Sequence, residues 1–394
     1  MKKILPLIIL AFYATSIFAQ IINFNQGRIK QKHYLQQIPY QKIEELLVVP
    51  VTINGKNYQF AFDTGAPLVV SDKIFKELSL PAKGQMVASD AEGKKKKMRL
   101  ARLQKIHLQG ITFMNTPGYV FHEDSEWFEC LGIDGIIGSN MLRHSVVQFD
   151  EENKQIIIAD HIKKLSLQTK EYQPMKLSII QSNPYFSVTI QKEKERAEDV
   201  LFDSGYGGFL ALSINKFNCH VVDTIAESEG RFGLGAHGFH DSQKYLLLKI
   251  PELVVNKLHF NDVIITTTHS GDSRLGAELL QFGRATLDYQ KKRFYFEPYE
   301  HINADKLSEI PKLYTTIEND KLIVGIIWDK TLESQINLGD EILSINGMDI
   351  QSMSFCELFL LKFPESDKCI LELRDIITGA IKTVEIERMQ LNKE

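Results

Sequence analysis

Most of the chain alternates short apolar runs with turn-forming residues, and this pattern predicts β-strands rather than long helices. The first clear pair of strands spans residues 46–53 and 58–62, with Asn54 and Gly55 between them. Asn-Gly between two apolar runs is the strongest short signal for a β-hairpin. The second strand runs directly into Asp63, so a carboxylate is expected at the end of an apolar strand.

The same arrangement occurs a second time in the chain. Residues 185–190 and 200–202 form the second predicted hairpin, around a polar turn, and its second strand ends at Asp203. A hydroxyl residue and a glycine follow each aspartate, which gives the triplets Asp63-Thr64-Gly65 and Asp203-Ser204-Gly205. A single triplet of this kind usually caps a turn, but a matched pair favours a shared function.

An apolar element that ends in glycine follows each triplet at nearly the same distance. Gly138 lies 75 positions after the first aspartate, and Gly276 lies 73 positions after the second. Each glycine is followed 12 positions later by a strand-ending aspartate, Asp150 or Asp288, which we interpret as structural. This agreement indicates an internal duplication. It predicts a mainly β fold class, with two lobes that form a pair of β-barrels.

The two repeated aspartates are predicted to lie side by side. A carboxylate at the end of an apolar strand is costly to bury unless a partner compensates it, and an equivalent carboxylate from a related lobe can be that partner. Two carboxyl groups in contact cannot both ionise easily, so the pair is expected to share one proton. One member can then accept a proton from water while the other donates one.

The last part of the chain predicts a separate small domain. Residues 301–311 are polar and flanked by helix and strand breakers, which is typical of a linker. Several strand-like runs and one helix predicted near residues 354–363 then indicate a small α+β domain. The predicted organisation is a signal peptide at 1–19, an N-terminal extension at 20–43, lobe 1 at 44–165, lobe 2 at 166–300, the linker at 301–311 and the α+β domain at 312–394.

The first residues of the chain predict export. Two lysines precede an apolar stretch from Ile4 to Ala19 that contains Pro6, as in a secretory signal peptide. These 16 residues are fewer than the roughly 20 that a membrane-spanning helix needs. We therefore expect cleavage after Ala19 and a mature protein in the periplasm or the extracellular space that does not span a membrane.

Charge and cysteine content exclude few classes of protein. A formal net charge of -4 gives no basic surface for nucleic acid, and the Lys94–Lys97 run is short enough to be a solvated hairpin. The chain is long enough to build cores without disulfides, so the cysteines are interpreted as optional disulfides or buried thiols. In an oxidising compartment three pairings are open to them: they are Cys130, Cys219, Cys356 and Cys369.

Both triplets, with their downstream glycines, resemble the two active-site halves of retropepsin-like and pepsin-like aspartic proteases. The resemblance implies that Asp63 and Asp203 are the catalytic pair. It also implies that a hydroxyl from each triplet ties the two loops together, that the glycines permit the tight turns, and that apolar-Gly elements pack below. The residues in these supporting roles are Thr64, Gly65, Ser204, Gly205, Ile136, Ile137, Gly138, Leu275 and Gly276.

In this family a hairpin from each lobe covers the substrate cleft. The corresponding segments, residues 84–98 and 230–242, contain no tyrosine, which departs from the pepsin-like pattern. The first copy also carries an extra stretch, residues 123–131, that includes Trp127. These departures bear on substrate preference more than on the aspartate pair.

Residues 337–347 resemble the strand and turn of a PDZ domain, and the two resemblances together are similar to exported bacterial aspartyl proteases that carry a PDZ domain. The resemblance implies that a peptide C-terminus extends the strand beginning at Lys321 and Leu322 by β-augmentation. The glycine expected in a carboxylate-binding loop is absent around Asn319, so purely structural docking is the competing interpretation.

The resemblance implies an exported aspartic endopeptidase that hydrolyses peptide or protein substrates with water and needs no metal or other cofactor. The alternative is a catalytically inactive peptide-binding or scaffold protein with the same fold. Ala66 and Tyr206 follow the two glycines, where acid-adapted relatives often have a hydroxyl that hydrogen bonds a carboxylate. We therefore expect activity that extends towards neutral pH.

Two other patterns are interpreted as incidental. Residues 233–238 match the dinucleotide fingerprint Gly-x-Gly-x-x-Gly, but no predicted strand leads into them and no helix follows, so they favour a hairpin tip. His237, His240 and Asp241 could be considered metal ligands, but polar residues on a flexible loop are more often solvated.

Overall fold

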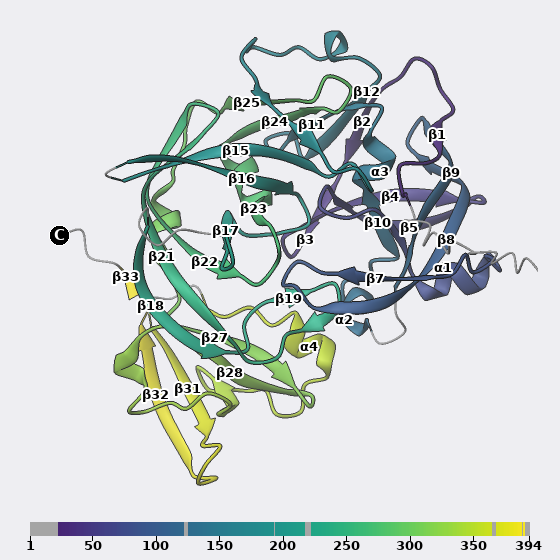
Figure 1. Cartoon of the computed structure of the whole chain (residues 1–394). Coiled ribbons are helices and arrows are strands. Elements are labelled where there is room, and N and C mark those ends of the chain that lie inside the picture. The colour runs from purple at the N-terminus through teal and green to yellow at the C-terminus, as the bar shows by residue number, and fades with distance from the viewer. Residues whose placement is uncertain are drawn as a thin grey trace, which may run out of the picture.

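The computed structural model describes residues 23–121, 125–192, 194–216, 222–364, 368–387 and 389–390. Figure 1 shows two lobes side by side, a sheet that connects them and a C-terminal unit packed against both. The fold class predicted from the sequence, mainly β with two lobes, is confirmed. The predicted signal peptide, Cys219 and Glu123 lie outside the described residues.

Lobe 1 is built on one mixed sheet that begins with the predicted hairpin. Asn54 and Gly55 have positive φ angles of 50° and 82°, which allow the two-residue turn, and they join strands that pair from Val48↔Ala61 to Ile53↔Lys56. In spatial order the strands described in this sheet are β1 (Arg28–Ile29), β9 (Ile111–Val120), β6 (Leu68–Val70), β10 (Gly135–Gly138), β5 (Lys56–Asp63), β4 (Leu46–Ile53), β8 (Lys95–Leu108) and β7 (Gln85–Ser89), with β3 (Gln41–Ile43) beside β4.

Lobe 2 repeats this connectivity. In lobe 1, β10 runs parallel to β5 and antiparallel to β6, with Gly138 opposite Asp63. In lobe 2, β23 runs parallel to β16 and antiparallel to β17, with Gly276 opposite Asp203. The strands of this sheet in spatial order are β14 (Lys176–Leu177), β15 (Pro184–Gln191), β16 (Glu195–Asp203), β23 (Ser273–Gly276), β17 (Leu210–Ser213), β22 (Leu258–Thr268), β21 (Gln243–Val255) and β18 (Asp223–Gly230).

A sheet with strands from both lobes joins them. It pairs β11 with β24 antiparallel, so that the closing strands of the two lobes lie side by side. Asp150 and Asp288 end these strands and accept backbone hydrogen bonds from Asn153 and Lys291, as turn-forming residues do. Its strands in spatial order are β13 (Gln173–Pro174), β25 (Arg293–Pro298), β24 (Gly283–Asp288), β11 (Val146–Asp150), β12 (Gln155–Ala159) and β2 (Leu35–Pro39).

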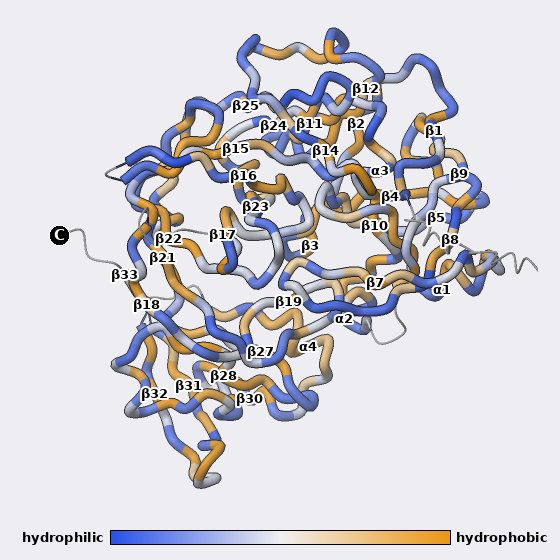
Figure 2. The backbone as a smooth tube through the Cα atoms, viewed as in Figure 1, coloured by the Kyte–Doolittle hydropathy of each residue, from blue (hydrophilic) through white to orange (hydrophobic). Residues whose placement is uncertain are grey.

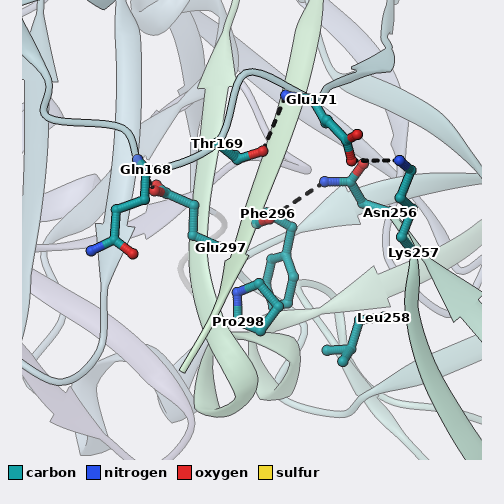
Figure 3. Close-up of a pocket in the computed structure, with 9 residues that line it drawn as sticks. All are labelled: Gln168, Thr169, Glu171, Asn256, Lys257, Leu258, Phe296, Glu297 and Pro298. Atoms are coloured by element: carbon teal, nitrogen blue, oxygen red, sulfur yellow. Dashed lines mark hydrogen bonds and ion pairs between the residues drawn. The ribbon is translucent and has the colours of Figure 1, made fainter. Parts of the chain in front are cut away.

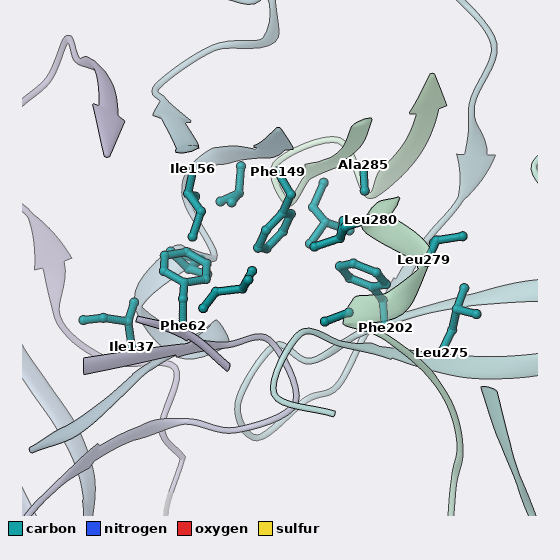
Figure 4. Packing of buried hydrophobic residues seen from close by; sticks show 14 of the residues in the cluster. Phe62, Ile137, Phe149, Ile156, Phe202, Leu275, Leu279, Leu280 and Ala285 are labelled. Carbon is teal, nitrogen blue, oxygen red and sulfur yellow. The ribbon is translucent and has the colours of Figure 1, made fainter. Parts of the chain in front are cut away.

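The main hydrophobic core lies where this sheet meets the two aspartate-bearing strands. Phe149 of β11 stands between Phe62 and Phe202, with ring centroids 5.6 Å and 5.8 Å away, and all three side chains are fully buried (Figure 4). Figure 2 shows hydrophobic residues along the inner strands and hydrophilic residues along the outer turns. Because Phe62 and Phe202 directly precede the two aspartates, this core fixes the bases of both loops.

Short helices and turns fill the remaining connections. Ser71 caps the first helix by accepting a hydrogen bond from the backbone N–H of Ile74. The described helices of the two lobes are α1 (Asp72–Glu77), α2 (Glu126–Cys130), α3 (Ser139–Leu142) and the 3-10 turns η1 (Ile162–Lys164) and η2 (Ala277–Phe282).

The C-terminal unit is a small sheet with one helix. Its helix starts at a capping box formed by Ser354 and Glu357 and is shorter than the predicted range 354–363. The described elements are η3 (Asp305–Ser308), β26 (Glu309–Ile310) paired with β33 (Met389–Gln390), η4 (Lys330–Leu332), α4 (Phe355–Phe359) and a sheet in the order β27 (Leu313–Glu318), β28 (Lys321–Ile327), β29 (Glu341–Ile345), β31 (Lys368–Arg374), β32 (Ile381–Glu387), with β30 (Met348–Asp349) beside β29.

The C-terminal unit is attached to both lobes. A disulfide joins Cys130 of α2 to Cys356 of α4, which lie next to each other in Figure 1. On the other side, the backbone N–H of Arg231 donates to the Gly325 carbonyl at 2.7 Å. The sequence left the pairing of the cysteines open; in the structure Cys130 and Cys356 form a disulfide, and Cys369 is a half-buried free thiol.

The predicted N-terminal extension is part of the fold from residue 23 onwards. β1 pairs with β9, β2 pairs with β12, and Phe24 is fully buried. Among the described residues, no helix has the length and apolar character needed to cross a membrane.

Candidate active site

The two predicted catalytic aspartates come together between the lobes. A methyl group added at Gly65 would lie 2.5 Å from Cγ of Asp203, and one added at Gly205 would lie 2.4 Å from Cγ of Asp63. Each carboxylate therefore rests against the glycine of the opposite loop, where no larger residue fits. The two loops approach each other this closely only because both carry glycine.

Two hydroxyl groups tie the loops together with nearly symmetric hydrogen bonds. Oγ1 of Thr64 donates to the Phe202 carbonyl at 2.6 Å and accepts from the Ser204 N–H at 3.0 Å. Oγ of Ser204 donates to the Phe62 carbonyl at 2.8 Å and accepts from the Thr64 N–H at 3.1 Å. Both side chains are fully buried, so these bonds are shielded from water and hold the carboxylates in fixed positions.

The residues below the loops are those that the resemblance implied, with additions. Ile137 and Leu275 are fully buried, and Gly138 and Gly276 stand opposite the two aspartates in the parallel pairs described above. Ser139 adds a hydroxyl that donates to the Thr64 carbonyl and lies 3.3 Å from the Tyr289 hydroxyl.

The connection between β14 and β15 of lobe 2 also holds the first loop. Nδ2 of Asn183 donates to the Gly65 carbonyl at 2.6 Å, and Nε2 of Gln181 lies 3.4 Å from the same oxygen. No pattern in the sequence pointed to Ser139, Tyr289 or Asn183, because none of them belongs to the repeated motif.

The two aspartates differ in their hydrogen-bond partners. Oδ1 of Asp63 accepts from the N–H groups of Gly65 at 2.7 Å and Ala66 at 3.1 Å. Burial and the neighbouring Asp203 carboxylate nevertheless hold the pKa of Asp63 well above its usual range, so its protonated form is favoured. Oδ1 of Asp203 accepts from the Gly205 N–H at 3.0 Å.

A buried arginine contacts the pair, which the sequence analysis did not predict. Nη1 of Arg274 lies 3.0 Å from Oδ2 of Asp203, and the arginine side chain is 4% exposed. Arg274 stands directly before Leu275-Gly276, at the position that Ile136 holds before Ile137-Gly138. The signal in the sequence was this break in the repeat, where an apolar residue in lobe 1 is replaced by a cation in lobe 2.

The carboxylates face a cleft of about 1170 Å³. Lobe 1 and the extra helix α2 supply an apolar wall, and lobe 2 supplies most of the polar lining near Arg274. The residues of the apolar wall include Met98, Tyr119, Phe121, Trp127, Phe128 and Ile136. Trp127, which the sequence singled out in the extra stretch, therefore lies in the candidate site.

The hairpin between β7 and β8 crosses the cleft and contacts lobe 2. We call the contacts of residues 88–94 with residues 233–240 and 268–269 the hairpin clasp. The Asp90 carboxylate accepts from the His237 N–H at 3.1 Å and lies 3.3 Å from Nε2 of His240, and the side chains of Asp90 and His240 are both buried. Nζ of Lys94 donates to the Phe239 carbonyl at 2.8 Å, so the lysine run is not simply solvated.

The tip of the hairpin makes a second set of contacts in the clasp. Oγ1 of Thr268 donates to the Ala91 carbonyl at 3.1 Å and lies 3.2 Å from Oε2 of Glu92. Burial raises the pKa of Glu92 to about 7, although Arg274 and His240 oppose the shift. The carboxyl group of Glu92 therefore changes its charge near neutral pH while it is buried at the tip of the closed hairpin.

The residues considered as metal ligands belong to this clasp. His237 and His240 contact Asp90, and residues 233–238 form the narrow ribbon of β19 (Leu234–Gly235) and β20 (Gly238–Phe239), a hairpin tip as the sequence indicated. Within the ranges that the structure describes, no group of three or more His, Cys, Asp or Glu side chains is arranged to hold a metal ion.

Lys321 and Leu322 do not lie at a free sheet edge. They begin β28, where they pair with Glu318 and Ile317 of β27, and the other side of β28 faces β29. The described edge strands of this sheet are β27, which was not predicted from the sequence, and β32. A peptide strand added at an edge of this sheet would pair with β27 or β32, and not with Lys321 and Leu322.

A smaller cavity of about 280 Å³ lies between the segment after η1 and the β21–β22 turn (Figure 3). Its polar groups are already paired, because Lys257 forms an ion pair with Glu171 at 2.6 Å and the Thr169 hydroxyl accepts from the Glu171 N–H. It contains none of the predicted catalytic residues and is a surface recess rather than a second site.

Comparison with known proteins gives one family match. Residues 49–141 match the family described as Aspartyl protease. This range contains Asp63 with its triplet and Gly138, so lobe 1 is aspartyl-protease-like in its sequence. No curated protein sequence matches the chain.

Solved structures similar to the chain include an aspartic proteinase from Irpex lacteus, with a TM-score of 0.41 and 12% identity over 68% of this chain and 98% of that chain. They also include basic 7S globulin from soybean, with a TM-score of 0.40 and 10% identity over 69% of this chain and 99% of that chain.

Proposed function

We propose that the chain is an aspartic endopeptidase with Asp63 and Asp203 as its catalytic residues. The observation that supports this most is the close approach of the two aspartate loops, in which each carboxylate lies against the glycine of the opposite loop and both aspartates line the cleft. The match of residues 49–141 to the aspartyl protease family supports the same reaction class.

The proposed reaction uses one water molecule and the single proton that the pair holds. The ionised carboxylate takes a proton from the water, whose oxygen bonds to the scissile carbonyl carbon, while the protonated carboxyl donates its proton to the carbonyl oxygen. The resulting gem-diol then collapses. One hydroxyl proton returns to the second carboxyl, the first carboxyl protonates the leaving nitrogen, and the C–N bond breaks to give an acid and an amine.

The substrate that fits this cleft is an extended peptide with an apolar side chain on the lobe 1 side. The apolar wall ending in Trp127 and Phe128 offers such a side chain a dry surface. Because the hairpin clasp closes over the cleft, the hairpins have to open before a polypeptide can enter.

We further propose that the protein is exported, as its first 19 residues indicate, and that the C-terminal unit is a PDZ-like domain. Its candidate partner is a peptide C-terminus added to the edge strand β27. No metal or other cofactor and no nucleic acid is part of the proposal.

Two observations favour the alternative, a peptide-binding protein without catalysis. One oxygen of Asp203 is occupied by Arg274, and the closed clasp limits access to the pair. In that case the cleft would bind peptides and release them uncut.

Cleavage of a denatured protein or a peptide library across pH 3 to 8 separates the two functions. Endopeptidase activity should be lost in Asp63→Asn and in Asp203→Asn and should be blocked by a statine-type inhibitor. Asp199→Asn is the matched control, because Asp199 lies in the same strand as Asp203 with its side chain 51% exposed. A folded protein that binds the inhibitor but cuts no substrate at any pH would support the non-catalytic function.

A further inference from the structure

Arg274 breaks the equivalence of the two lobes next to the aspartate pair. In lobe 2 it stands opposite Leu201 of β16 and Ala211 of β17. The equivalent position in lobe 1 holds Ile136, opposite Ala61 and Val69. The same place in the fold therefore carries a fixed positive charge on one side of the pair and an apolar side chain on the other.

The guanidinium of Arg274 pairs with the Asp203 carboxylate and not with the Asp63 carboxylate. Nη1 of Arg274 donates to Oδ2 of Asp203 at 3.0 Å, with side chains that are 4% and 7% exposed. A buried ion pair is stabilising only while both partners are charged, because an uncompensated buried charge is strongly unfavourable. Asp63 accepts hydrogen bonds from the backbone N–H groups of Gly65 and Ala66, and no cationic side chain among the described residues pairs with it.

The other titratable groups around the pair leave this asymmetry in place. The Tyr206 ring lies 5.9 Å from the guanidinium carbon of Arg274. The Tyr185 hydroxyl donates to Asp272, and the Tyr289 hydroxyl lies beside Ser139 below Asp63. Burial raises the pKa of all three tyrosines, so they stay neutral.

Glu92 is the remaining acidic group that the Arg274 charge acts on. Nε of Arg274 has no hydrogen-bond partner among the described residues. The Asp203 carboxylate is therefore the only described side chain that hydrogen bonds to this guanidinium.

We propose that Arg274 is a positioning residue that assigns the two roles within the pair, keeping Asp203 as the charged base and leaving the shared proton on Asp63, the acid. This inference rests on the proposed function of the pair. Since arginine stays protonated at all relevant pH values, it also keeps one charge on the pair at lower pH than two isolated carboxyls would. The base that accepts the proton of the water is then always in lobe 2.

The test measures protonation directly and activity separately. Carboxyl ¹³C signals of the aspartates, assigned with the Asp63→Asn and Asp203→Asn variants, report which carboxyl is ionised as pH changes. The pH profile of kcat/KM on a cleaved peptide reports the working form. Both are measured in the wild type, in Arg274→Met, in Arg274→Lys and in the control Arg284→Met, whose arginine is half-buried in β24 and does not line the cleft.

In the wild type, the Asp203 signal should be that of a carboxylate while the Asp63 signal is that of a carboxylic acid. Arg274→Met should move the acidic limb of the profile upward by at least about one pH unit, the smallest effect typical of a neighbouring cation. Arg274→Lys should recover most of the shift, and Arg284→Met should not change the profile.

Two results would overturn the inference: an ionised Asp63 beside a protonated Asp203 in the wild type, or unchanged signals and profile in Arg274→Met. If Arg274→Met does not fold, the wild-type and Arg274→Lys spectra still decide. A wild type that cuts nothing but shows the expected carboxyl signals would remove the proposed function and leave the charge assignment standing.

Discussion

Replacing Glu92 with glutamine should stabilise the closed hairpin at alkaline pH and leave it unchanged at acidic pH. Glu92 lies at the tip of the β7–β8 hairpin, with its carboxyl group beside the Thr268 hydroxyl and against Gly233 of lobe 2. Burial raises its pKa from 4.5 to about 7. The closed state therefore favours the neutral acid, which glutamine imitates in shape and hydrogen bonding.

The sign and size of the effect follow from the raised pKa. A carboxyl group whose pKa is higher in the closed state contributes stability below pH 4.5 and loses it as the pH rises through about 7. The interval between these values corresponds to at most about 3 kcal/mol of opening free energy. At pH 8 the wild-type hairpin should be less stable than the glutamine variant by up to this amount.

Hydrogen exchange of residues 86–98, corrected for intrinsic rates, measures the opening free energy at each pH. Burial also lowers the pKa of His237, but this acts in both proteins, so their difference isolates Glu92. Glu227→Gln is the matched control, because Glu227 pairs with Lys244 on the surface with both side chains 53% exposed. A glutamine variant that opens more easily than the wild type at pH 8 would refute the reasoning.

Three further perturbations test the contacts that hold the site. Asp90→Asn removes one partner of the buried Asp90–His240 pair, at a cost of about 3–5 kcal/mol. Hydrogen exchange of residues 86–98 should therefore accelerate at least a hundredfold, and equal exchange rates would show that the pair does not close the hairpin. Thr64→Val leaves the Phe202 carbonyl and the Ser204 N–H without a partner, and it should lower the free energy of unfolding by about 2–5 kcal/mol in urea titrations. Thr52→Val, at a partly exposed position in β4, should change the free energy of unfolding little. The double variant Cys130→Ser/Cys356→Ser should unfold about 2–4 kcal/mol more easily, and reductant should lower the wild type to the same value but leave the variant unchanged.

The parts of the fold that the sequence predicted are those set by local patterns. The Asn54-Gly55 turn, the alternating strands and the equal spacing of the repeats depend on neighbouring residues, and the structure has the corresponding hairpins and registers. The glycine of each triplet was expected as a turn residue from the resemblance, but the structure gives another reason for it: neither Gly65 nor Gly205 has a positive φ angle, and the carboxylate of the opposite loop lies against each.

The contacts that the sequence did not reveal join residues far apart in the chain. Asp90 and His240 are separated by 150 positions, and Cys130 and Cys356 by 226. Nothing in either segment specifies its partner, because the pairing depends on how two lobes and a third unit are placed. The sequence did contain a signal for Arg274, since this residue stands where the matching segment of lobe 1 has isoleucine.

These long-range contacts make the cleft a product of three units rather than two. Helix α2 contributes Trp127 and Phe128 to the apolar wall, and the disulfide at its end fixes this helix to α4 of the C-terminal unit. Phe239, whose carbonyl accepts the bond from Lys94 in the clasp, packs against the hydrophobic core of the same unit. One cleft wall and the lobe 2 side of the clasp therefore both rest on the C-terminal unit. Because the disulfide prevents this unit from separating from lobe 1, access to the aspartate pair depends on the β7–β8 hairpin releasing its tip.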